Sequence, residues 1–154
     1  MPTIEPIAHR TGDRAPETGV AVEKLRKPLS IVFGLMAVAV LLHFVLSAFY
    51  EDSVNVDSMW YVFNWIMAAG ILLALADIYI EKRALSEAGM ASQVWVNVAL
   101  YAAVVLAILF AWNWFDDLTV GEEGQSQVRL AYWAVIDVWF IVLIGTRSIS
   151  LWKA

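Results

Sequence analysis

Four long apolar runs constrain the fold of this chain more than any other feature of its sequence. They cover residues 29–50, 58–80, 94–115 and 128–152. Each run holds about 22 to 25 residues, which at a rise of about 1.5 Å per residue is enough to cross a hydrocarbon core about 30 Å thick. A helix also satisfies its own backbone hydrogen bonds, as lipid requires. The sequence therefore predicts an all-α integral membrane protein, a bundle of four transmembrane helices.

The basic residues predict how these helices are oriented. Of the 10 Lys and Arg residues, nine precede the first run, lie between the second and third, or end the fourth. These nine are Arg10, Arg14, Lys24, Arg26, Lys27, Lys82, Arg83, Arg147 and Lys153, and Arg129 lies on the other side. The positive-inside rule then places both termini in the cytoplasm. Because the loops are short, consecutive helices should be antiparallel neighbours, which predicts two transmembrane hairpins in the plasma (inner) membrane.

Little of the chain remains outside the four runs. Residues 1–27 are expected to form a cytoplasmic tail, because residues 1–17 combine prolines, a glycine and mixed charges, which is typical of an extended segment. Residues 28–154 then form a single four-helix domain. Pro28 is expected in the first turn of its helix, where the missing N–H is not needed.

Composition excludes several classes of function. The chain has no cysteine, which removes thiolate metal sites, iron–sulfur clusters and thiol catalysis. A bis-histidine haem within this chain is excluded as well, because only His43 of the two histidines lies in an apolar run. The basic residues lie where anionic lipid headgroups would meet them, so we expect the lipid bilayer and not nucleic acid as a partner. No resident cofactor or metal is predicted, and no residue is assigned a catalytic role.

Polar side chains inside an apolar run are costly and are therefore candidates for function. His43, Asn64 and Asp137 all fall toward the outer half of their runs, so they can form one polar cluster if their helix faces converge. Three interpretations are open. The cluster can be a hydrogen-bonded bracket that fixes helix register. It can be a proton relay or a quinone-facing site, or a metal site that another chain completes.

Two carboxylates mark the inner end of the second run. Asp77 and Glu81 lie four residues apart and therefore share a helix face. The adjacent Lys82 and Arg83 can neutralise them in the wet headgroup region. Asp77, the deeper of the two, can instead bind a basic residue of a partner subunit.

A ridge of small residues runs along the third helix. Alanines recur there at four-residue spacing, at Ala99, Ala103, Ala107 and Ala111. Such a smooth ridge lets another helix backbone approach closely. We expect the alanine ridge to pack against a helix, either within the bundle or in a neighbouring subunit.

The length, the four spans and the cytoplasmic termini resemble the small membrane subunit of tripartite periplasmic-binding-protein-dependent transporters. They equally resemble the small accessory subunits of membrane oxidases and monooxygenases. This resemblance is one of architecture, and it implies a non-catalytic accessory subunit of a larger inner-membrane complex, bound to other membrane subunits. The alternative is a small redox or proton-handling membrane protein that acts through His43 and Asp137.

Overall fold

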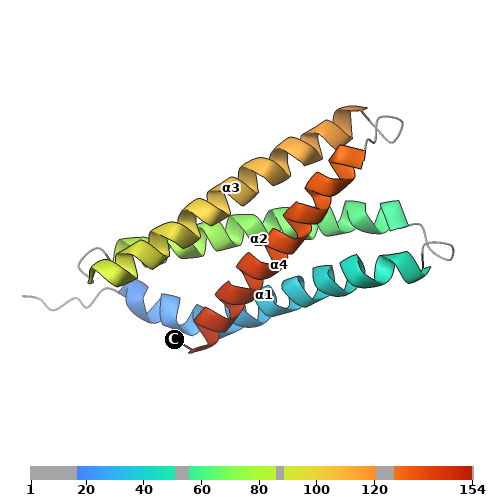
Figure 1. Ribbon diagram of the computed structural model, residues 1–154. Coiled ribbons are helices and arrows are strands. Elements are labelled where there is room, and N and C mark those ends of the chain that lie inside the picture. Colours follow the sequence, from blue (N-terminus) through green and yellow to red (C-terminus); the bar gives the residue numbers. More distant parts are fainter. Residues whose placement is uncertain (1–16, 51–55, 86–88, 121–126, 154) are drawn as a thin grey trace, which may run out of the picture.

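The computed structural model describes residues 17–50, 56–85, 89–120 and 127–153, and this part of the chain is built from four α-helices. The helices are α1 (Glu17–Tyr50), α2 (Val56–Ala84), α3 (Met90–Val120) and α4 (Gln127–Lys153). Figure 1 shows the chain reversing direction from each helix to the next. The described residues form no strand, and the prediction of an all-α, four-helix chain is confirmed.

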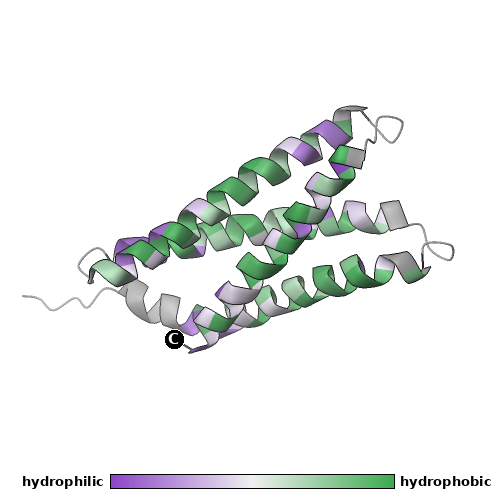
Figure 2. Ribbon diagram, in the orientation of Figure 1, coloured by the Kyte–Doolittle hydropathy of each residue, from purple (hydrophilic) through white to green (hydrophobic). Residues whose placement is uncertain are grey.

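Each helix contains a segment that is long and apolar enough to cross a membrane. The segments are Lys24–Ser47, Ser58–Ala84, Met90–Thr119 and Val128–Lys153. Figure 2 shows hydrophobic residues along the middle of the helices and hydrophilic residues gathered toward the ends. Large apolar side chains such as Leu35, Leu72 and Ile108 are exposed on the outside of the bundle. A surface this apolar suits contact with lipid, as a multi-pass membrane protein requires.

The start of α1 differs from the prediction. The helix begins at Glu17, so Pro28 lies inside it, and the prediction that Pro28 stands in the first turn is wrong. Proline has no N–H to donate, and its ring displaces the carbonyl of Lys24 one turn earlier, which bends a helix. Figure 1 shows the first turns of α1 at an angle to the rest. The expected boundary between tail and domain after residue 27 thus falls within a continuous helix, and residues 1–16 of the tail lie outside the described part.

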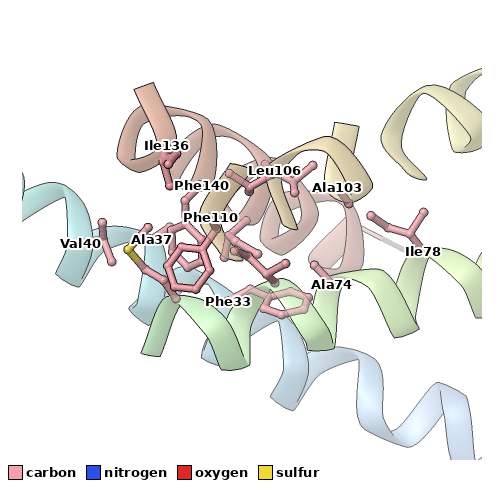
Figure 3. Close-up of a cluster of buried hydrophobic side chains, with 14 of the residues drawn as sticks. Phe33, Ala37, Val40, Ala74, Ile78, Ala103, Leu106, Phe110, Ile136 and Phe140 are labelled. Atoms are coloured by element: carbon pink, nitrogen blue, oxygen red, sulfur yellow. The ribbon is translucent and has the colours of Figure 1, made fainter. Parts of the chain in front are cut away.

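The core is shared by all four helices. The most extensive contacts are those of α1 with α4 and of α2 with α3, whereas α1 and α3 make no contact in the described part. Apolar side chains from every helix converge between them (Figure 3), among them Phe33 of α1, Ile78 of α2, Leu106 of α3 and Phe140 of α4. Because α2 and α4 each contact all three other helices, they form the centre of the bundle.

Small side chains explain why α1 and α4 pack so closely. A Cβ atom added at Gly34 would lie 3.0 Å from Oγ of Ser148, and one at Gly145 would lie 3.9 Å from Cβ of Ala37. Ser30 Oγ donates to the carbonyl of Ser148 at 2.7 Å, and Ser148 Oγ donates to the carbonyl of Ser30 at 2.8 Å. This reciprocal pair needs both backbones at close range, and small residues permit that approach.

Candidate functional site

The carboxylates Asp77 and Glu81 face α4, where they bind Arg147. The guanidinium Nε donates to Asp77 Oδ2 at 3.0 Å, Nη2 donates to the same oxygen, and Nη1 donates to Glu81 Oε2 at 2.6 Å. The side chain of Arg147 is only 9% exposed, and those of Asp77 and Glu81 are 16% and 33% exposed. We call these three residues the Arg147 cluster. It ties α2 to α4 at the end of the bundle where α4 ends.

The cation that binds Asp77 and Glu81 differs from those expected from the sequence. The sequence suggests either local neutralisation by Lys82 and Arg83 or, for Asp77, a basic residue of another subunit. In the structure the cation comes from α4 of the same chain. Arg83 instead lies over the ring of Tyr79, with its guanidinium carbon 6.0 Å from the ring centroid. A buried carboxylate needs a cation that is equally buried, and α4 presents one on the face that packs against α2.

A second arginine ties the other end of α4 to α3. Arg129 Nη2 lies 2.8 Å from Asp116 Oδ2 and 2.9 Å from Asp117 Oδ1. The arginine side chain is 8% exposed, while that of Asp116 is 48% exposed. Each arginine of α4 therefore binds two carboxylates, from α2 at one end and from α3 at the other. We call this second group the Arg129 cluster.

Replacing Arg129 with glutamine is expected to lower the free energy of unfolding by about 1 kcal/mol. The cost is small because both carboxylates are more exposed than Asp77, at 48% for Asp116 and 26% for Asp117, and can be solvated once their cation is gone. The loss in the free energy of unfolding is measured by unfolding the purified protein in mixed detergent micelles and following its tryptophan fluorescence. Arg83→Gln serves as the control. A loss as large as that expected below for Arg147 would contradict this account.

His43 lies between aromatic rings of α2. It is 4% exposed, stacks on Phe63 with ring centroids 4.5 Å apart and planes at 8°, and lies 4.4 Å from the Trp60 ring at 56°. The imidazole therefore contributes to the packing of α1 on α2 through its ring faces.

Asp137 is equally buried but lies elsewhere in the bundle. It is 4% exposed and stands on α4 close to the core residues Ile136 and Phe140. Among the described residues, no hydrogen bond or ion pair joins Asp137 to His43 or to the half-buried Asn64. The structure thus does not bring the three predicted polar residues into one hydrogen-bonded cluster.

The ring contacts of His43 explain why it does not bind Asp137. Its ring is held against Phe63 and Trp60 of α2, whereas Asp137 lies beside the core residues Ile136 and Phe140 of α4. The positions of the apolar runs alone cannot reveal these ring contacts.

The alanine ridge lies on the side of α3 that faces the core. Ala103 is fully buried, and Ala99 and Ala107 are partly buried against the core cluster, while Ala111 is half-buried. Figure 3 shows Ala103 among the core side chains. Within the described chain, α3 contacts α2 and α4.

Tryptophans connect α2, α3 and α4 through their ring edges. Trp65 meets Trp114 edge to face at 4.7 Å, and Phe110 meets Trp133 in the same way at 5.9 Å. Sequence reasoning did not identify these contacts, because tryptophans near a membrane surface are also expected to lie in lipid headgroups.

A shallow apolar groove of about 510 Å³ runs along one face of α4. Small, β-branched and aromatic side chains line it, at Ala134, Val135, Val138, Trp139 and Val142. In the described residues, no group of three or more His, Cys, Asp or Glu side chains is placed to hold a metal ion. Comparison of the chain with models of protein families, with curated proteins and with solved structures found no match.

Proposed function

We propose that this chain is a non-catalytic accessory subunit of a larger inner-membrane complex, of the transporter or the membrane oxidase and monooxygenase type. The observation that supports this proposal is the groove on α4. Val135, Val138 and Val142 are about half exposed or more, and β-branched side chains have few rotamers to lose when a second helix packs against them. The partner is an apolar transmembrane helix of another subunit, and the ion-paired bundle supplies a stable surface for it.

The experiment is native mass spectrometry of the tagged protein extracted in a mild detergent. We expect a complex of fixed stoichiometry that contains this chain and at least one other membrane subunit. Val138→Trp fills the groove and should release the partner while the chain itself stays folded. Val98→Trp is the matched control, because Val98 is 52% exposed on α3 and Val138 is 49% exposed. A single species that contains this chain alone, or equal loss of partner in both variants, would contradict the proposal.

The proposal includes an orientation with both termini in the cytoplasm and two antiparallel hairpins. It is supported by the distribution of basic residues and by the alternating direction of the helices in Figure 1. Because the chain has no cysteine, a single cysteine introduced at position 54 or 121 reports its own location. We expect both to react with a membrane-impermeant maleimide added outside intact cells. Reaction only after the cells are opened would reverse the orientation.

A second candidate is a small redox or proton-handling protein that acts through His43 and Asp137. The observation in its favour is the buried carboxyl of Asp137, whose Oδ1 has no hydrogen-bond partner. Absorption spectroscopy and metal analysis of the purified chain distinguish the two candidates. A haem, a quinone or a stoichiometric metal held by this chain alone would favour the second.

A further inference from the structure

The carboxyl group of Asp137 is buried inside the bundle. The residue is 4% exposed, and its Oδ1 has no hydrogen-bond partner among the described residues. An ionised carboxylate is very costly in an apolar interior unless a cation or several donors compensate it. The surroundings of Asp137 therefore determine which form of the acid the fold can hold.

None of the cations on α4 is within reach of this carboxyl. Arg129 and Arg147 lie eight and ten residues away along α4, which corresponds to about 12 and 15 Å. Both are already bound to two carboxylates each.

The helices packed against α4 supply no described cation bound to this carboxyl either. On α1, the ionisable residue between Lys27 and the end of the helix is His43, which stacks on Phe63 and forms no described hydrogen bond or ion pair with Asp137. On α2, the stretch between Tyr61 and Asp77 contains no ionisable side chain. On α3, Tyr101 is the ionisable residue before Asp116, and its side chain is exposed.

The backbone also favours a neutral acid. Asp137 stands in the interior of α4, where each N–H is used by the helix, and an ionised carboxylate can only accept hydrogen bonds. A protonated carboxyl has an O–H to donate, and carbonyls one turn earlier in a helix can accept a second bond. This chain uses that pattern elsewhere, since Thr146 Oγ1 donates to the carbonyl of Val142 at 2.7 Å and Asn113 Nδ2 donates to that of Leu109 at 2.9 Å.

We propose that Asp137 is a proton-binding site in the centre of the bundle, which holds its proton at neutral pH while the protein is folded. The ligand is a single proton, and neither His43 nor a metal takes part in holding it. The proposal does not depend on whether the chain is an accessory subunit. It distinguishes Asp137 from Asp77, Asp116 and Asp117, each of which forms an ion pair with an arginine of α4.

Infrared spectroscopy of the purified protein at neutral pH tests this directly. A protonated carboxylic acid absorbs at a higher carbonyl frequency than an ionised carboxylate or an amide. We expect one such band, with its intensity corresponding to one group per chain. It should be lost in Asp137→Asn, which keeps the shape of a neutral acid, and retained in Asp77→Asn.

Isotope labelling keeps the test independent of whether the variants fold. In the wild-type chain, a carbon-13 carboxyl label on aspartate should shift the band, whereas the same label on glutamate should not. Unfolding in strong detergent at the same pH should abolish the band, because the exposed carboxyl then ionises. Absence of the band from the folded wild-type chain, or its persistence in folded Asp137→Asn, would overturn the proposal.

Discussion

Replacing Arg147 with leucine is expected to lower the free energy of unfolding by about 3 to 5 kcal/mol. The variant leaves the carboxylates of Asp77 and Glu81 in place without their cation, and the Asp77 side chain is only 16% exposed. Removing one partner of a buried ion pair costs this much because the remaining charge stays desolvated. Unfolding in mixed detergent micelles, followed by tryptophan fluorescence, measures the loss.

Two further variants separate the ion pairs from a general effect of the substitution. Arg83→Leu makes the same change on α2, where the arginine is exposed over Tyr79, and should cost less than about 1 kcal/mol. Replacing Asp77, Glu81 and Arg147 together by leucine should recover most of the stability, since no buried charge is then left unpaired. If Arg147→Leu costs no more than Arg83→Leu, the Arg147 cluster is solvated and does not hold α2 to α4.

Replacing Gly70 with leucine is expected to cost about 3 kcal/mol through overpacking. A Cβ atom at this position would lie 3.0 Å from both Cε2 and Cζ of Phe140 and 3.3 Å from Sδ of Met36. Met36 is flexible, but Phe140 is fully buried among the core side chains. The added side chain must therefore separate α2 from α4. The same unfolding measurement applies, and Gly70→Ala should give a smaller loss in the same direction.

Gly89→Leu is the matched control for this prediction. A Cβ atom added at Gly89 would meet nothing within 4 Å, so the substitution should leave the packing of the bundle unchanged. Phe140→Ala combined with Gly70→Leu should recover part of the loss, because the smaller residue makes room for the leucine. A stable Gly70→Leu variant would show that α2 and α4 are not in close contact at this level.

Helix α4 holds the bundle together, because it contacts all three other helices. Arg147 and Arg129 form ion pairs with carboxylates of α2 and α3, and Ser148 is hydrogen-bonded to Ser30 of α1. Phe140 packs on Gly70 of α2. The polar contacts lie toward the two ends of the helix, and the apolar core lies between them. Asp137 is the exception, because it is a charged residue type in the apolar middle of the same helix.

The candidate site could be predicted from the sequence only in part. The spacing of Asp77 and Glu81 indicates a pair on one helix face, whereas Arg147 contributes only to the charge distribution that orients the chain. An arginine at the same membrane end as two deep carboxylates is a signal that could have identified their partner. The serine pair at Ser30 and Ser148 has no such signal, because a serine in an apolar run can equally bond to its own helix.

The full length of each helix cannot be predicted from the sequence, since α1 already begins at Glu17, but the number of helices and the apolar segment of each can. These follow from continuous apolar runs and from the need of a backbone in lipid to satisfy its own hydrogen bonds. The tertiary structure alone decided which helices pack most closely and which polar residues meet. Which residues meet depends on the rotation and depth of each helix. Small residues such as Gly34, Gly70 and Gly145 influence both, because they let neighbouring helices approach closely. His43 stacks on Phe63 of α2, and no described hydrogen bond or ion pair joins it to Asp137, although the sequence places the two residues at the same depth.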